Sequence, residues 1–218
     1  EEAEELRQRA VTFKVDGLNF EGVVAQPEAH ASSMPGVVVC HPHPLYGGDM
    51  DSSVVLAVTF ALAEQGFATL RFNFRGVGSS EGRHGKGEAE QEEVLGALEM
   101  LNAWPGVDGR RVGLAGYSFG ASVVLGSPVL HRKARAFALI SPPLRALEST
   151  KLGTNDLPML VIAGDRDKPV QSDQFLATLE SFDYPPTCHV IAGADHFWSG
   201  YENQLAPRVA EFFSATLK

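Results

Sequence analysis

Residues 111–124 read RVGLAGYSFGASVV, and this stretch decides the fold. An apolar run leads into residues 116–120, GYSFG, and small residues typical of a buried helix follow. A G-x-S-x-G string between a strand and a helix forms a sharp turn that projects the serine hydroxyl outward. The two glycines relieve crowding, and the serine takes the backbone strain. The string is common by chance, and the alternative is a serine N-cap between turn glycines. The strand before Ser118 and the helix after it favour a nucleophile.

Apolar runs and helical segments alternate along the rest of the chain. Continuous apolar runs separated by helices indicate parallel strands that are buried on both faces of a sheet. A leading hairpin, turned at Asp16-Gly17, adds an antiparallel part, so we expect a mixed three-layer α/β/α sandwich. The expected strands are Val11–Val15, Leu18–Gln26, Gly36–Cys40, Phe67–Phe74, Arg111–Gly116, Ala134–Ile140, Met159–Ala163 and Cys188–Ile191, and the expected helices are Ser52–Gln65, Glu88–Ala103, one starting at Ser118, Ser172–Phe182 and Leu205–Leu217.

The length of 218 residues fits one domain, residues 1–218. Apolar residues make up 44% and charged residues 21%, as in globular proteins with a sizeable core. Residues 142–157 form the longest irregular piece between strands and are too short for a lid domain. The acidic runs, residues 1–5 and 88–93, are interpreted as solvated helix ends or faces. We expect binding of ligands at the carboxyl ends of the strands.

The net charge of −9 argues against a nucleic-acid partner, because phosphate backbones are bound by clustered Lys and Arg. Two cysteines, Cys40 and Cys188, indicate no disulfide framework and are expected as buried thiols. No apolar run has the length of a membrane span, and the acidic start is unlike a signal peptide. We therefore expect a cytoplasmic protein that does not bind membranes, and the oligomeric state stays open between a monomer and a homodimer.

A serine hydroxyl needs a neighbouring base to take its proton. In folds with this turn, the order along the chain is serine, acid, histidine. His196 lies in a loop after the strand that ends at Ile191, where a base belongs, whereas His189 is expected as a packed strand residue. Asp165 and Asp167 both follow the preceding strand, and one carboxylate suffices to orient the histidine. Asp195 is interpreted as a turn residue that binds local backbone.

The loop of residues 41–48, HPHPLYGG, is a second motif that indicates an active site, and it follows the strand that ends at Cys40. Folds of this kind place an oxyanion-binding amide here. Proline has no N–H group, so the amide of His43 is the expected donor, with Leu45 or Tyr46 behind it. The amide of Phe119 is the other expected donor, because the first N–H groups of a helix lack intrahelical partners.

Alternatives that use a metal or a nucleotide are weaker. His41 and His43, with Asp49 and Asp51 nearby, suggest a metal site, but their spacing matches no known ligand pattern. Residues 76–82 mimic a dinucleotide-binding loop, but Glu81 stands where the third glycine is required. Lys86 follows a glycine without the serine or threonine of a P-loop. We therefore expect no metal and no cofactor.

Taken together, these motifs resemble the α/β-hydrolase superfamily, and within it the small, lidless, dienelactone-hydrolase-like bacterial branch. The resemblance covers nearly the whole chain and implies a mainly parallel eight-stranded sheet whose first strand is antiparallel. In that superfamily the acid is usually the last residue of Gly-x-x-Asp, which implies Asp167. True dienelactone hydrolases use a cysteine nucleophile, so their lactone specificity does not extend to Ser118. The motifs that carry the resemblance are HPHPLYGGDMDSSVV, RFNFRGVGSSEG with the downstream GEAEQEEV, GYSFG, GDRDKPV and GADHFW.

The prediction is a serine hydrolase that cleaves a small-molecule carboxylic ester through an acyl-enzyme at Ser118. Because no lid is expected, a small or short-chain acyl group is favoured. The alternatives are an acyl-thioesterase or peptidase-like acyl hydrolase, and a non-catalytic binding module on a hydrolase scaffold. Four aromatic residues near these loops are expected either to line an apolar pocket or to belong to the core: Tyr46, Phe119, Phe197 and Trp198.

Overall fold

The computed structural model describes residues 6–28 and 33–218. The acidic N-terminal run interpreted as a solvated helix end lies outside the described residues. Eight strands form one sheet in the order β1-β2-β4-β3-β5-β6-β7-β8. The strands are β1 (Leu6–Val15), β2 (Leu18–Pro27), β3 (Met34–Cys40), β4 (Ala68–Phe72), β5 (Val107–Tyr117), β6 (Phe137–Ile140), β7 (Met159–Gly164) and β8 (Thr187–Ile191).

The sheet is mainly parallel, as expected, but the reversed strand is the second. β2 pairs antiparallel with both β1 and β4, while β4, β3, β5, β6, β7 and β8 pair in parallel. The tight turn at Asp16 and Gly17, both with positive φ, reverses the chain between β1 and β2. β1 therefore runs with the parallel strands, so the implied antiparallel first strand is wrong.

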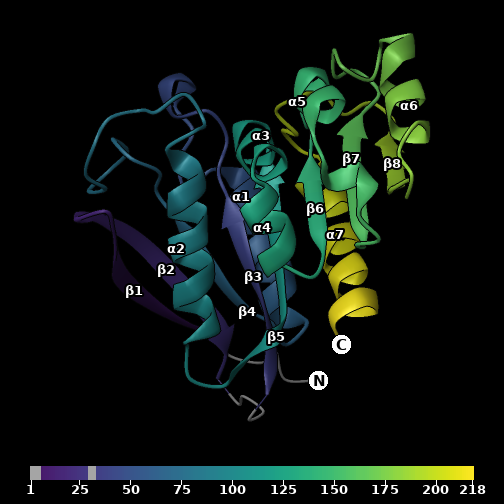
Figure 1. Ribbon diagram of the computed structural model, residues 1–218. Helices are drawn as coiled ribbons and strands as arrows, with labels where there is room; N and C mark the ends of the chain where they lie inside the picture. Colours follow the sequence, from purple (N-terminus) through teal and green to yellow (C-terminus); the bar gives the residue numbers. More distant parts are fainter. Residues whose placement is uncertain (1–5, 29–32) are drawn as a thin grey trace.

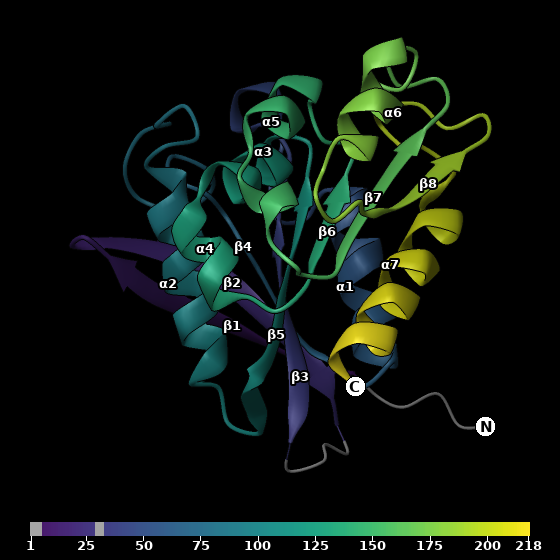
Figure 2. The ribbon, with the colours of Figure 1, turned by 45° about the vertical axis from the view of Figure 1, so that its right-hand side comes forward.

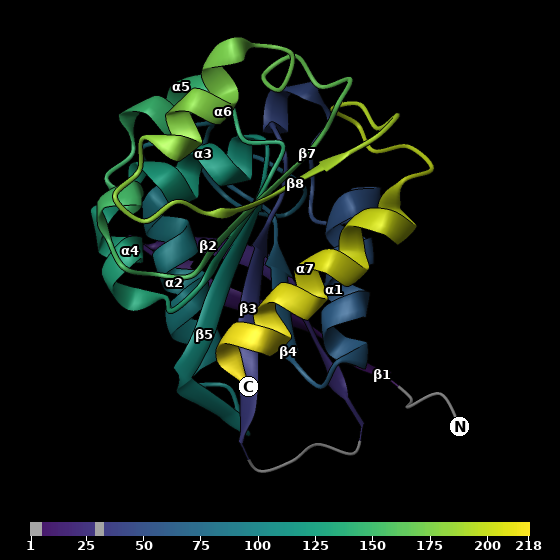
Figure 3. The same cartoon turned by 90° about the vertical axis from the view of Figure 1, so that its right-hand side faces the viewer.

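Helices cover both faces of the sheet. Helices α1 and α7 pack against each other on one face, and α2, α3 and α4 lie on the other (Figures 1 and 3). Each face has its own apolar core, which confirms the three-layer architecture. The helices are α1 (Ser53–Glu64), α2 (Glu90–Asn102), α3 (Phe119–Gly126), α4 (Pro128–Lys133), α5 (Leu144–Ser149), α6 (Asp173–Glu180) and α7 (Glu202–Leu217), with the 3₁₀ turns η1 (Pro44–Tyr46) and η2 (Leu152–Thr154). None of the helices in the described ranges is long and apolar enough to cross a membrane.

The central strands are buried, and the last strand is not. All residues of β3, β4, β6 and β7 are buried, as their continuous apolar runs predict. β8 is the edge of the sheet and exposes His189 and Val190, while Cys188 is only half-buried. The predictions of a packed His189 and a buried Cys188 are therefore wrong, because burial here depends on the strand order. Figure 2 shows β8 at the edge, with α6 and α7 beside it.

The acidic start of α2 also differs from the prediction. Glu88 and Glu92 are exposed, but Glu90 and Glu93 are completely buried. Glu93 forms an ion pair with Arg75, and it also accepts the N–H of Arg75 at 3.0 Å. Burial raises the pKa of Glu93 to about 7. Half of the run is therefore solvated, and the other half holds the loop that follows β4.

Candidate active site

Ser118 occupies the turn between β5 and α3. β5 ends at Tyr117 and α3 begins at Phe119, and Ser118 between them has φ 53° and ψ −105°. Positive φ is uncommon outside glycine, so the surrounding structure must hold it. The Ser118 N–H donates to the carbonyl oxygen of Ile140 at the end of β6, at 2.9 Å. The neighbouring strand thus fixes the turn that presents the hydroxyl.

The two glycines of the motif are sterically required. A Cβ atom at Gly116 would lie 2.6 Å from the backbone nitrogen of Ala121 in α3. A Cβ atom at Gly120 would overlap the carbonyl oxygen of Cys40 at the end of β3. Both positions therefore allow α3 to approach the strands, as the sequence predicts.

Ser118, His196 and Asp167 form one hydrogen-bonded chain. The Oγ of Ser118 lies 2.9 Å from Nε2 of His196, and Nδ1 of His196 lies 3.0 and 3.1 Å from the two carboxylate oxygens of Asp167. Because an ionised carboxylate only accepts hydrogen bonds, Nδ1 carries the proton and the Nε2 lone pair faces the serine hydroxyl. Asp167 is buried, whereas the His196 side chain is about one third exposed (36%).

The other candidate acid, Asp165, and the predicted turn residue Asp195 both bind backbone. Asp165 accepts the N–H of Gly193 at 2.8 Å, and Asp195 accepts the N–H of Phe197 at 2.9 Å. Both contacts shape the loop that carries His196. Of the two carboxylates that the residues alone left open, Asp167 is the one that contacts the imidazole.

Two further contacts hold the His196 loop and were missed in the sequence. The Tyr117 hydroxyl donates to the carbonyl oxygen of His196 at 2.7 Å. The buried indole N–H of Trp198 donates to Oγ of Ser141 at 3.0 Å. Trp198 therefore belongs to the core rather than to a pocket. Tyr117 fills a variable position of the motif, and Ser141 lies far from Trp198 in the sequence, so neither contact leaves a local signal.

Among the described residues, the His43 amide in the loop after β3 has no hydrogen-bond partner. The Leu45 amide donates to Nδ1 of His43 at 3.2 Å, and the Tyr46 amide donates to the His43 carbonyl oxygen at 3.0 Å. The amides of His43 and Phe119 donate to no other residue within the described part of the chain. Both are free for a ligand oxygen, whereas those of Leu45 and Tyr46 are engaged in the loop itself.

His41 is a structural residue. It is fully buried, its Nε2 accepts the N–H of Phe74 at 3.0 Å, and its Nδ1 lies 2.7 Å from the carbonyl oxygen of Pro42. Burial lowers the pKa of His41 to about 4, so the ring is neutral at pH 7. Both nitrogens are engaged, which leaves neither for a metal, and across residues 6–28 and 33–218 no metal-binding cluster of His, Cys, Asp or Glu is present.

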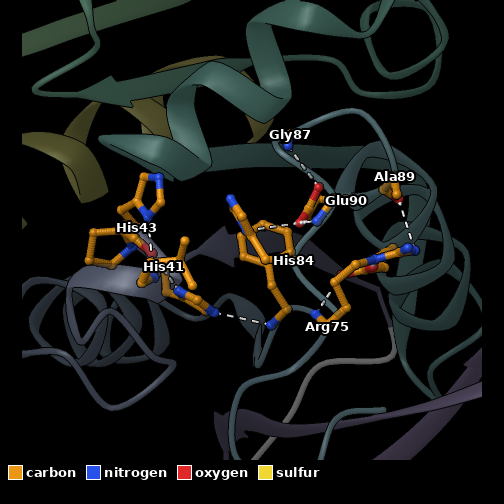
Figure 4. A network of polar contacts seen from close by, with 12 residues as sticks. His41, His43, Arg75, His84, Gly87, Ala89 and Glu90 are labelled. Atoms are coloured by element: carbon orange, nitrogen blue, oxygen red, sulfur yellow. Dashed lines mark hydrogen bonds and ion pairs between the residues drawn. The ribbon is translucent and has the colours of Figure 1, made fainter. Parts of the chain in front are cut away.

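The His43 ring lies in an aromatic cluster beside a buried carboxylate. Its centroid is 4.7 Å from Tyr46, 4.9 Å from Phe119 and 5.1 Å from His84. Nδ1 of His84 lies 3.3 Å from the buried Glu90, which also accepts the backbone N–H groups of two loop residues (Figure 4): Gly85 and Gly87. Burial, and then the charge of His84, lower the pKa of His43. The loop after β3 therefore packs against a wall that Glu90 fixes.

A cavity of about 610 Å³ opens beside Ser118. Its walls come from the loop after β3, from the start of α1, and from Tyr117, His196 and Phe197. The loop residues in the lining are Pro42, His43, Tyr46, Gly47 and Gly48. Tyr46 and Phe197 thus line it, as expected, while Leu45 does not. Phe119 lines a neighbouring depression of about 430 Å³ instead.

The chain is similar to known proteins in its sequence and in its fold. The model of the alpha/beta hydrolase domain family matches residues 37–206. An uncharacterised protein of Rickettsia prowazekii is 31% identical over 198 residues, which are 85% of this chain and 81% of that protein.

Solved structures extend the likeness to the fold. An alpha-beta serine hydrolase homologue from Coxiella burnetii is 31% identical, with a TM-score of 0.81 over 93% of this chain and 96% of that one. A serine hydrolase without a lid from Xanthomonas campestris is 28% identical, with a TM-score of 0.79 over 96% of this chain and 94% of that one. The family match, the sheet and the helical layers agree. The chain therefore belongs to the alpha/beta hydrolases.

Proposed function

We propose that the protein is a serine hydrolase that cleaves a carboxylic ester through an acyl-enzyme on Ser118. The observation that carries this proposal is the hydrogen-bonded chain from Ser118 Oγ through His196 to Asp167. The arrangement contains a nucleophile, a base with the correct nitrogen free, and a carboxylate that fixes the tautomer. The small-molecule ester is the proposed substrate, and no cofactor takes part in the reaction.

In the first half-reaction, Nε2 of His196 takes the proton of Ser118 while Oγ attacks the ester carbonyl carbon. The negative charge that develops on the carbonyl oxygen is bound by the amides of His43 and Phe119, which have no other partner among the described residues. Fixed amide donors stabilise this oxygen because they need no reorganisation during the reaction. Asp167 stabilises the imidazolium that forms.

The tetrahedral intermediate collapses when the carbon–oxygen bond to the alcohol breaks. His196 returns its proton to the leaving alkoxide, and the acyl group stays on Ser118. Water then attacks the acyl carbon while Nε2 of His196 takes a proton from it, and the carboxylic acid leaves as the Ser118 hydroxyl is restored. The exposed part of the His196 ring allows water to reach this position.

An ester panel and a thioester panel with the same acyl groups test the proposal. We expect ester hydrolysis with the larger kcat/KM, and a loss of at least about 10⁴-fold in kcat in Ser118→Ala. Larger values for thioesters would replace the proposal by the thioesterase alternative. Turnover of neither class by folded protein would favour a non-catalytic binding module.

A further inference from the structure

The most exposed apolar side chains surround the proposed active site. Seven large apolar residues are exposed in the described part of the chain, and the three highest fractions belong to Tyr46 (87%), Phe197 (72%) and Leu45 (69%). Single exposed apolar residues are normal on a protein surface. These three instead gather on the two loops that flank Ser118, which follow β3 and β8. Their position indicates an apolar ligand at the mouth of the cavity.

Tyr46 and Phe197 are held in place although they are exposed. The Tyr46 ring packs 4.7 Å from the ring of His43, and the Phe197 ring lies edge to face with His196 at 5.8 Å. Each aromatic side chain therefore rests on a histidine of the site. Backbone contacts fix the same residues, because the Tyr46 amide binds the His43 carbonyl oxygen and the Phe197 amide binds Asp195. The two rings form preformed walls, one from each loop.

The described residues that line the cavity between these walls include no Asp, Glu, Lys or Arg. The ionisable residues among them are His43, His196 and two tyrosines. Burial lowers the pKa of His43, which favours the neutral ring. An uncharged group therefore fits this space better than one with a full formal charge, because no charged side chain among the described lining residues would pair with it.

The cavity is larger than an acetyl group needs. Its volume of about 610 Å³ lies within the roughly 300–1,000 Å³ of pockets that bury drug-sized ligands. A two-carbon acyl group would leave most of this space to water. A second cavity of about 440 Å³ is lined by His196 and Phe197 but not by Ser118. It suits the leaving alcohol, which receives its proton from His196.

We propose that the acyl group of the substrate is an uncharged apolar chain of about six to ten carbons, bound between Tyr46 and Phe197. This inference rests on the proposed function and replaces the short-chain expectation. That expectation assumed that a site without a lid is shallow and open. The two exposed aromatic rings provide the apolar cover that a lid would otherwise supply.

A series of p-nitrophenyl esters from acetate to dodecanoate tests the inference. Each methylene that enters the cavity should raise kcat/KM by up to about fourfold, which corresponds to about 0.8 kcal/mol, until an optimum near six to ten carbons. Tyr46→Ala and Phe197→Ala should lower kcat/KM at this optimum at least about tenfold and affect the acetate less, because only the long chain reaches the rings. Leu176→Ala removes an exposed leucine on α6 and should leave the profile unchanged.

Three results would overturn the inference. One is a kcat/KM that is highest for acetate and falls with every added carbon. Another is an optimum that follows the length of the alcohol in a matched alkyl butyrate series instead of the acyl chain. The third is a change of oligomeric state in Tyr46→Ala or Phe197→Ala by light scattering, with an unchanged chain-length profile. A fluorophosphonate probe distinguishes failure of this inference from failure of the proposed function. Enzyme that is labelled but has its optimum at acetate refutes only the chain length. Folded wild type that is not labelled refutes the proposed function.

Discussion

Replacing Asp167 by asparagine separates the roles of two neighbouring carboxylates. Asp167 is buried (2% exposed), and both of its oxygens lie within 3.1 Å of Nδ1 of His196. An asparagine amide that donates to Nδ1 would stabilise the opposite tautomer, with the proton on Nε2. Nε2 could then no longer accept the proton of Ser118. We expect kcat to fall by about 10⁴-fold in Asp167→Asn, which corresponds to about 5.5 kcal/mol at about 1.36 kcal/mol per decade.

Asp165→Asn is the matched control. Its Oδ1 accepts the backbone N–H of Gly193, and an asparagine side-chain oxygen accepts the same bond. We expect kcat within about twofold of wild type, because the exchange removes a charge that does not touch the imidazole.

The assay is ester turnover at saturating substrate. Circular dichroism verifies that each variant is folded, and kcat is calculated from the concentration of folded protein. The pH is held constant near 7.5 for all variants. A loss in Asp165→Asn as large as in Asp167→Asn, or more than one tenth of the wild-type kcat in Asp167→Asn, would refute the assignment of the acid.

Three further outcomes follow from the packing. Gly120→Ala should lower the free energy of unfolding by about 1–3 kcal/mol, measured by urea titration, because its Cβ would overlap the Cys40 carbonyl oxygen; unchanged stability and turnover would contradict the close contact. A maleimide should modify the half-buried Cys188 in the folded protein and Cys40 only after unfolding, by mass spectrometry, since burial excludes the reagent and raises the pKa of Cys40; equal rates would contradict this. The His41 pKa of about 4 lies below its unfolded value of 6.5, so the unfolded state binds more protons between these values. The stability advantage of wild type over His41→Gln should therefore be full above pH 6.5 and shrink by about 2–3 kcal/mol as pH falls to 4.5; a constant difference would contradict a neutral buried ring.

The order of Ser118, Asp167 and His196 could be predicted because each lies in the turn or loop that follows a strand whose apolar run is visible in the sequence. The turn at Ser118 is encoded locally, since Gly116 and Gly120 are the residues that the close approach of α3 requires. Choosing between Asp165 and Asp167 needed the family resemblance. They are two residues apart in one loop, and only their orientations in space distinguish them.

Features that depend on contacts between distant segments could not be predicted. Glu90 and Glu93 have the spacing of a solvated acidic run, but their partners come from the loop after β4, which includes Arg75 and His84. His189 lies in an apolar stretch, and its exposure follows only from the position of β8 at the edge of the sheet. The residues of the loop after β3 are also visible in the sequence, but the sequence does not indicate which amides the loop itself engages.

Covalent labelling of Ser118 tests the central claim most directly. Folded wild-type protein is incubated with a fluorophosphonate, and intact-mass and peptide spectra are recorded. The account predicts one adduct per chain on the peptide that contains Ser118, no adduct in Ser118→Ala, and much slower labelling in Asp167→Asn than in Asp165→Asn. Folded wild type that stays unmodified, or an adduct on another residue with Ser118 free, would contradict the account.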